Sequence, residues 1–120
     1  MLRFHHIPIF EHDLPTAVRE FVAILNSSFN DEGPVRCISA SGAHGLVEAK
    51  KDSSFKSILS LFYWNLPDGM PLVWWGRLKG HRTMDRCYGP DFFAAILQAT
   101  SALEVAHFFC GGKQGVAEEL

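Results

Sequence analysis

The sequence predicts an α/β fold in which helices cover both faces of a parallel β-sheet. Short apolar runs alternate with segments of helical period along the chain, and polar or glycine-rich turns follow three of the runs. This alternation is typical of parallel strands joined by helical crossovers. Because ligands in such folds bind beyond the carboxyl ends of the strands, these turns are the first places to expect a site.

The composition indicates one globular domain. Of the 120 residues, 48% are apolar and 20% are charged, with 11 basic residues against 13 acidic ones. This charge balance argues against nucleic acid as a partner. No apolar run approaches the ~20 residues that span a bilayer, and the N-terminus does not resemble a signal peptide. We therefore expect a cytoplasmic protein.

The cysteines and histidines do not indicate a metal site or a disulfide. Cys37, Cys87 and Cys110 are widely spaced and form no C-x-x-C pattern, so we expect reduced thiols in the core. No two histidines stand at the i, i+4 spacing of a helical metal pair. No D-x-D pair is present to hold a divalent cation, and we expect no metal cofactor.

The first part of the chain predicts a strand followed by a helix. Apolar residues within 2–10 indicate a first strand, at a sheet edge because Pro8 has no N–H to donate. Asp13 is a candidate N-cap, with Pro15 in the first turn of the following helix. Apolar residues at helical spacing continue this helix to about Leu25.

The middle of the chain predicts strands and helices in alternation. The expected elements are a turn at 30–34, a short buried strand at 35–39, a loop at 41–45 that opens a helix to 50 or 51, a helix restarting at Asp52, a strand at 61–64, a turn at 67–69 and a helix at 71–78 that ends at Gly80. The sharp turn at 67–69 places a carboxylate directly between two apolar elements, where α/β proteins hold reactive side chains.

The last part of the chain predicts an unfinished domain. The expected elements are a helix from 89 or 91 to about 101, a strand at 105–110, a glycine loop at 111–115 and a helix at 116–120. Ser41, Asp68 and the glycine loop would then share one edge of the sheet. Because the last helix has barely more than one turn, it has not buried its apolar face. We infer the N-terminal portion of a longer, Rossmann-like domain.

Two charged residues are candidates for chemistry, each with a structural alternative. Asp68 is a candidate general base that takes a proton from an attacking hydroxyl, or else the N-cap of the helix at 71–78, which the spacing favours. The planar fork of Arg86 suits a diphosphate. Its alternative is a surface salt bridge with Asp85 or Asp91.

The flexible loops offer weaker candidates. The loop at 111–115 could hold phosphate on backbone amides, or form a strand-to-helix turn that needs positive φ. Ser41 is a candidate ligand contact or a helix cap, and His44 a sugar-site residue or, more in keeping with its position, a surface histidine. Trp74 and Trp75 could stack on a ligand, but this spacing is commoner in packing or self-association.

Taken together, the motifs resemble a known family. The segments 68–74, 86–91 and 107–118 are similar, in this order and at about these separations, to D-G-x-P-x-V-W, R-V-x-G-x-D and F-x-x-G-G-x-x-G-V-A-E of the WecG/TagA/CpsF glycosyltransferases. The segment 41–49 also resembles T-G-V-H-G-x-x-E-A of one branch. The resemblance covers roughly residues 35–120 and, more weakly, the preceding strand and helix.

The resemblance implies transfer of an N-acetylated hexosamine or related sugar from a UDP-sugar to a polyprenyl-diphosphate-linked acceptor. Such products feed teichoic acid, common antigen or exopolysaccharide at the inner face of the bacterial plasma membrane. It implies an inverting displacement with Asp68 as base and Arg86 on the phosphates, and Ser41 stands where the family usually has threonine. The remaining motif positions implied at the substrate are His44, Gly69, Asp91, Gly111, Gly112 and Gly115.

A second class of function is also compatible with the sequence. The chain could be a non-catalytic module that binds a nucleotide or a partner, or an inactive truncated remnant of the enzyme. The family resemblance favours the transferase, and a self-associating form is suggested by the adjacent Trp74 and Trp75.

Overall fold

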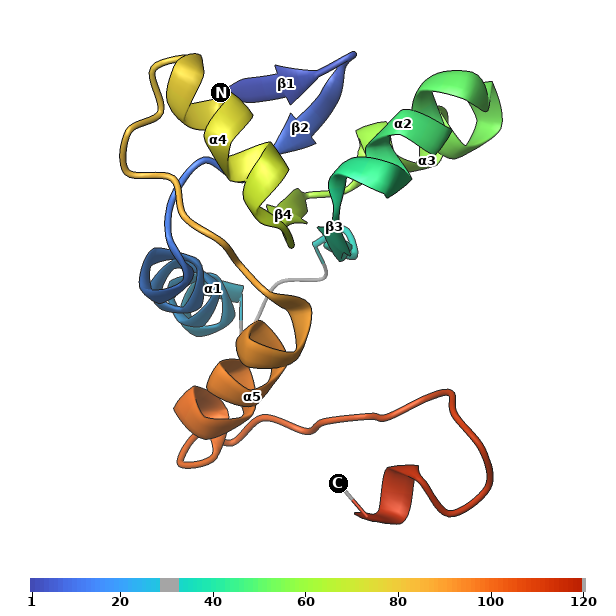
Figure 1. Ribbon diagram of the computed structural model, residues 1–120. Helices are drawn as coiled ribbons and strands as arrows, with labels where there is room; N and C mark the ends of the chain where they lie inside the picture. The colour runs from blue at the N-terminus through green and yellow to red at the C-terminus, as the bar shows by residue number, and fades with distance from the viewer. Residues whose placement is uncertain (29–32, 120) are drawn as a thin grey trace.

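The computed structural model describes residues 1–28 and 33–119 and confirms the α/β class (Figure 1). In chain order the elements are β1 (Leu2–Phe4), β2 (Ile7–Ile9), α1 (Leu14–Ser28), β3 (Ile38–Ser41), α2 (Ala43–Lys51), α3 (Ser53–Leu61), β4 (Trp64–Pro67), α4 (Met70–Leu78), α5 (Gly89–Thr100) and a short 3₁₀ helix, η1 (Ala117–Glu119). Within the described residues the strands form two small pairs, one parallel and one antiparallel.

The parallel pair β3–β4 is the part of the fold that positions the candidate site. Its register runs from Ile38 opposite Trp64 to Ser41 opposite Pro67, and α2 and α3 form the crossover. On the other side of β4 lies β2, and the N–H of Phe10 just beyond β2 donates to the Asn65 carbonyl at 3.0 Å. The strands therefore lie side by side over the core.

The prediction of one strand over residues 2–10 is wrong, because this segment is a hairpin. β1 and β2 pair antiparallel, with Leu2 opposite Ile9. His5 and His6 form the turn with φ of 46° and 77°, a left-handed conformation that non-glycine residues seldom adopt. Folding back lets the apolar side chains of both halves reach one core.

The two internal strands begin later than the sequence predicts. The expected strand at 35–39 is β3, beginning at Ile38, and Val35 is 90% exposed instead of buried. The expected strand at 61–64 is β4, beginning at Trp64, because the last turn of α3 extends to Leu61. The two strands begin together because their register opens with Ile38 opposite Trp64, and Asn65 takes the next, fully buried place in β4.

The helices agree with the capping signals in the sequence. Asp13 Oδ1 accepts a 2.9 Å hydrogen bond from the Thr16 N–H at the start of α1. Asp52 Oδ1 likewise accepts from the N–H groups of Ser54 and Phe55 at the start of α3. Gly80, with φ of 103°, follows the end of α4. These helix ends are fixed by local bonds, which is why the sequence predicts them.

The segment after α5 differs from the prediction. No strand forms at 105–110 within the described residues, and the chain there runs out past α5 in irregular, largely exposed structure (Figure 1). It contacts α5 through the Thr100 hydroxyl and His107 Nε2 (2.8 Å) and through the rings of Phe93 and Phe109. Without a neighbouring strand, this apolar run cannot form ladder hydrogen bonds.

Two further predicted elements lie partly outside the described residues. The expected helix at 116–120 is only the 3₁₀ turn η1, and residue 120 lies outside the described residues. The expected turn at 30–34 also falls mostly outside them, since the description resumes at residue 33. No helix in the described part of the chain combines the length and apolarity needed to cross a membrane.

The core lies between the hairpin, the crossover helices and α4. Its largest cluster combines buried side chains from β1, β2, α2, α3, α4 and the loop after α4: Leu2, Ile7, Ile9, Leu46, Ala49, Leu59, Leu72, Val73 and Met84. A second cluster, made of Phe10, Ala17, Leu66 and Cys87, joins α1 to β4. The second cluster contains Leu66 of β4, the strand that leads to the candidate site.

Candidate functional site

The carboxyl end of the β3–β4 pair brings two of the predicted site residues together. Ser41 is the last residue of β3 and lies opposite Pro67, and the N–H of Asp68 donates to the Ser41 carbonyl at 3.2 Å. The prediction that these two residues share one sheet edge is confirmed. We take this edge as the candidate site.

The Asp68 carboxylate is held in place by a different helix from the one expected. Its Oδ1 accepts a 2.8 Å hydrogen bond from the N–H of Gly89, the first residue of α5. The proposed N-cap role at α4 is wrong, because Gly69 is the N-cap there and makes no side-chain bond. Half-buried Asp68 has no hydrogen-bond partner at Oδ2 among the described residues, so the lone pairs of that oxygen are available.

Arg86 lies beside Asp68 rather than in a surface salt bridge. Its Nε donates to the Asp68 carbonyl at 2.6 Å, and its guanidinium lies 4.4 Å from the centre of the Tyr88 ring. The Asp85 carboxylate pairs instead with Arg77 at 3.4 Å. Within the described structure the Nη groups of exposed Arg86 make no bond, so two charged donors stand free next to Asp68.

Three helix N-termini meet at the same edge. Helix α2 begins directly after β3, α4 begins directly after β4, and α5 begins at the residue bonded to Asp68 (Figure 1). Their N-caps, Gly42, Gly69 and Tyr88, contribute no side-chain cap. The first N–H of α5 is taken by Asp68, whereas no side chain caps the first turns of α2 and α4, where free N–H groups and aligned peptide dipoles favour an anion such as phosphate. The N-cap of α2 is Gly42, so the capping role considered for Ser41 is wrong.

A hydrogen-bonded network that the sequence analysis missed supports Ser41. The Ser41 and Ser39 hydroxyls are 2.8 Å apart, and Ser39 Oγ lies 2.6 Å from Oδ1 of Asn65. Asn65 is completely buried and its Nδ2 donates to the carbonyls of Pro8 and Leu59. The i, i+2 spacing of the serines on one strand was the only signal, and Asn65 carried none.

The remaining predicted residues are more dispersed. Gly69 is the N-cap of α4, while exposed His44 and Asp91 lie in the first turns of α2 and α5. The glycine loop is far from the β3–β4 edge, on the segment past α5, so the expectation of a common edge is wrong for it (Figure 1). Its Gly111, Gly112 and Gly115 all have positive φ, as a turn requires.

Of the two adjacent tryptophans, Trp75 packs against the fold and Trp74 is exposed. Trp75 is half-buried and meets the Phe4 ring edge-on at 5.6 Å, as the packing alternative predicts. Trp74 is 57% exposed. Neither indole has a described contact with Asp68 or Arg86, and the stacking role stays a prediction.

The thiols do not add a nucleophile to the site. All three cysteines are free, but only Cys87 is buried, so the expectation of core thiols is wrong for Cys37 and Cys110. Burial, with smaller effects of Asp13 and Asp85, raises the pKa of Cys87 to about 12. Cys87 therefore stays a neutral thiol at physiological pH. The described part of the chain contains no group of three or more His, Cys, Asp or Glu side chains that could bind a metal ion.

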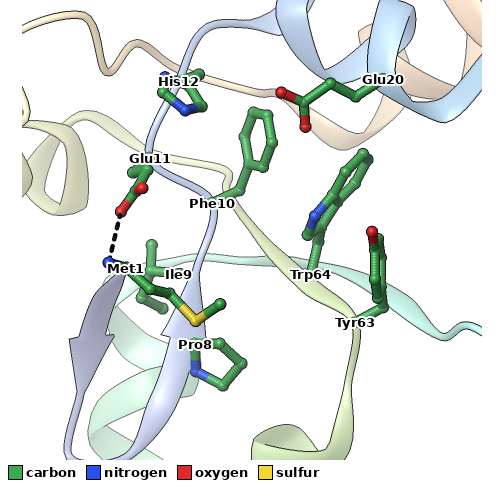
Figure 2. Close-up of a pocket in the computed structure, with 9 residues that line it drawn as sticks. All are labelled: Met1, Pro8, Ile9, Phe10, Glu11, His12, Glu20, Tyr63 and Trp64. Carbon is green, nitrogen blue, oxygen red and sulfur yellow. Dashed lines mark ion pairs between the residues drawn. The ribbon is translucent and has the colours of Figure 1, made fainter. Parts of the chain in front are cut away.

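A separate hollow of about 130 Å³ lies at the opposite end of β4 (Figure 2). Figure 2 shows the Phe10 and Trp64 rings side by side with the Glu20 carboxylate pointing toward them. The two rings are tilted by 52° and their centroids are 4.8 Å apart. Trp64 begins β4, whereas Asp68 follows its last residue. The hollow is thus separate from the candidate site.

Comparison with known proteins identifies the family of the chain. Residues 3–120 match the model of the glycosyl transferase WecG/TagA/CpsF family. The chain is 28% identical over 112 residues to the N-acetylglucosaminyldiphosphoundecaprenol N-acetyl-beta-D-mannosaminyltransferase of Bacillus subtilis (strain 168). That alignment covers 93% of this chain but 42% of the relative, so the chain spans less than half of the relative's length. On the family match, which covers nearly the whole sequence, the chain belongs to the WecG/TagA/CpsF glycosyl transferase family.

Proposed function

We propose that the carboxyl end of β3–β4 binds the diphosphate of a UDP-sugar, and that Asp68 is the base for transfer of an N-acetylated hexosamine to a polyprenyl-diphosphate-linked acceptor. The product would serve bacterial cell-surface polysaccharide synthesis at the cytoplasmic face of the membrane. Family membership supports a sugar transfer, and the relative's name describes transfer of N-acetylmannosamine to a lipid diphosphate carrying N-acetylglucosamine.

The observation that carries the proposal is the setting of the Asp68 carboxylate. It is anchored at Oδ1 by the Gly89 N–H at the start of α5, has no hydrogen bond at Oδ2, and lies beside Arg86 at a point where α2 and α4 begin without side-chain caps. A base must be fixed within reach of the hydroxyl whose proton it takes. The surrounding partial positive charges suit a leaving group that departs as a diphosphate anion.

In the proposed reaction the Asp68 carboxylate is the base, and the donors around it hold the diphosphate. Oδ2 of Asp68 removes the proton of the acceptor hydroxyl while that oxygen forms a bond to the anomeric carbon. The bond from the anomeric carbon to the diphosphate oxygen breaks, and its electron pair leaves with UDP. Arg86 and the helix N-termini stabilise the negative charge on the diphosphate. One displacement from the opposite side inverts the anomeric configuration, and the step requires no redox partner.

The test is UDP release from UDP-N-acetylhexosamines in the presence of a polyprenyl-diphosphate acceptor analogue. Asp68→Asn keeps an oxygen for the Gly89 N–H, so the fold should persist, while loss of the base should lower turnover by about 10²- to 10⁴-fold. Asp52→Asn is a matched control, because asparagine also caps a helix and Asp52 caps α3 away from the site.

Two outcomes would contradict the proposal in different ways. An undiminished rate for Asp68→Asn would remove Asp68 from the mechanism. Binding of UDP-sugars by the unmodified chain without any UDP release would favour the non-catalytic nucleotide-binding module instead.

A further inference from the structure

The orientation of the Asn65 amide is fixed by its surroundings. Its Nδ2 lies 2.9 Å from the Pro8 carbonyl and 3.0 Å from the Leu59 carbonyl. Both carbonyls accept only, so the amide nitrogen must face them and Oδ1 must face Ser39. Because Asn65 is completely buried, water cannot offer it an alternative set of partners.

This orientation determines where both serine protons go. Oδ1 of Asn65 has no proton, so Ser39 donates its only hydroxyl proton across the 2.6 Å contact. Ser39 is left with lone pairs alone, so in the 2.8 Å contact between the serines Ser41 is the donor. Ser41 has then used its one proton and presents only lone pairs to its surroundings.

We propose that Ser41 recognises the ligand as a hydrogen-bond acceptor, and therefore contacts a hydroxyl or amide N–H of the sugar rather than a phosphate oxygen. Ionised phosphate oxygens accept only and would meet lone pairs on Ser41. A sugar hydroxyl or an acetamido N–H can donate. Ser41 thus determines specificity for the sugar, and Ser39 and Asn65 are positioning residues that hold its proton away from the ligand. This inference rests on the proposed function.

The positions of the donors and of the acceptor at the carboxyl end of β3–β4 agree with this assignment. Ser41 ends β3 and is 8% exposed, so little of its surface is open to a ligand. The free Nη groups of Arg86 and the N-termini of α2 and α4, which have no side-chain cap, are donors and suit phosphate. Ser41 is the acceptor among these donors, so the sugar, which is uncharged and carries hydroxyl and N–H donors, should lie against it.

The first test compares the affinity for a UDP-N-acetylhexosamine with that for UDP by calorimetry. Ser41→Ala should weaken UDP-sugar binding by about 2- to 10-fold, the value of one neutral hydrogen bond, and leave UDP binding unchanged. This variant keeps the bond between Ser39 and Asn65, so the fold should persist. Ser57→Ala, which removes an exposed hydroxyl bonded to the Ser53 carbonyl in α3, is the matched control and should change neither affinity.

Ser39→Ala tests the positioning role. Freed from Ser39, the Ser41 hydroxyl loses its fixed direction, so UDP-sugar affinity should fall while UDP affinity stays. In a protein that already carries Ser41→Ala, adding Ser39→Ala should lower the affinity for the UDP-sugar no further. If Ser39 had only a structural role, Ser39→Ala would lower both affinities together, and this result would contradict the positioning role.

Sugar analogues test the direction of the bond. Analogues with each hydroxyl replaced by hydrogen or fluorine, or with the acetamido N–H replaced by an ester oxygen, identify the position that is coupled to Ser41→Ala. At that position fluorine or ester oxygen should lose as much affinity as removal of the group, because Ser41 has no proton to give. Full affinity of the fluorine or ester analogue would show that Ser41 donates and would overturn the inference.

The outcomes also separate this inference from the function on which it rests. If the unmodified chain binds UDP and UDP-sugar and Ser41→Ala changes their ratio by less than 1.5-fold, the inference fails and the proposed function stands. If the unmodified chain binds neither nucleotide, both fail.

Discussion

The N–H of Gly89 donates a 2.8 Å hydrogen bond to Oδ1 of Asp68, and this bond joins the end of β4 to the first turn of α5 across 21 residues of sequence. The two elements also meet β3 closely, since a Cβ on Gly89 would lie 3.0 Å from the Cβ of Ala40 and 3.6 Å from Asp68 Oδ1. The lack of a side chain at Gly89 therefore lets the start of α5 lie closely against Ala40 of β3, next to the carboxylate.

Replacement of Gly89 should consequently damage both stability and the site. Gly89→Ala should lower the free energy of unfolding by about 1–3 kcal/mol, the usual cost of overpacking. Gly45→Ala is the matched control in α2, where a Cβ meets nothing within 4 Å; it should raise stability by about 0.5–1 kcal/mol. Chemical denaturation measures both, and a Gly89→Ala protein more stable than the unmodified one would contradict the close packing described.

The guanidinium of Arg86 should matter for nucleotide affinity. Arg86→Lys loses the Nε bond to the Asp68 carbonyl and the stacking on Tyr88, and a single ammonium cannot replace the planar fork. We expect UDP affinity to fall about 10-fold, or ~1.4 kcal/mol. Calorimetry with exposed Arg82→Lys as the control checks this. Equal affinity of Arg86→Lys and the unmodified protein would exclude a bidentate phosphate contact.

The cap of α1 predicts a dependence of stability on pH. Hydrogen bonds from the Thr16 side chain and backbone, together with the charge of Arg19, lower the pKa of Asp13. A lowered pKa gives stabilisation that is complete above the unfolded-state pKa and is lost as pH falls through the folded-state pKa. Asp13→Ala should cost about 0.5–1 kcal/mol at neutral pH, the lower part of the capping range because Asp13 is solvent-screened.

The pH profile of Asp13 variants separates charge from capping. The stability difference between the unmodified protein and Asp13→Asn should change in acid, because asparagine caps without titrating. Urea denaturation at a series of pH values measures it. A difference that stays constant from neutral pH into acid would show that Asp13 titrates alike in both states.

The cysteines should differ sharply in reactivity. Exposed Cys37 and Cys110 should react with a thiol reagent at pH 8 in the folded protein, whereas Cys87 should not, because burial raises its pKa to about 12. Denaturant should release the third thiol. Labelling followed by mass spectrometry assigns each site, and rapid labelling of Cys87 in the folded state would mean that the contact between α1 and β4 opens.

Local features of the structure could be predicted from the sequence, whereas pairings between distant segments could not. The starts of α1 and α3 follow from Asp13 and Asp52, whose bonds reach only two or three residues along the chain. The position of β4 depends instead on Asn65, whose partner Pro8 is 57 residues away. A polar residue in a strand gives no sign in the sequence that it will be completely buried.

In the candidate site, too, local features could be predicted from the sequence and contacts between distant segments could not. Asp68 and Ser41 could be placed at one sheet edge because each directly follows or ends an apolar run. The partners that give them their chemistry, Gly89 and the Ser39–Asn65 pair, depend on the register of β3 against β4 and on where α5 docks. The glycine loop was misplaced because the apolar run before it has no neighbouring strand among the described residues.

The proposed mechanism requires the sugar diphosphate to lie at the carboxyl end of β3 and β4. The most direct test is a titration of the ¹⁵N-labelled protein with a UDP-N-acetylhexosamine, followed by amide chemical shifts. We predict the largest changes at the helix starts around Asp68, residues 42–44, 69–70 and 89, with little change at residues 63–64. Changes confined to the hollow around Phe10 and Trp64, with the amides beside Asp68 unmoved, would contradict it.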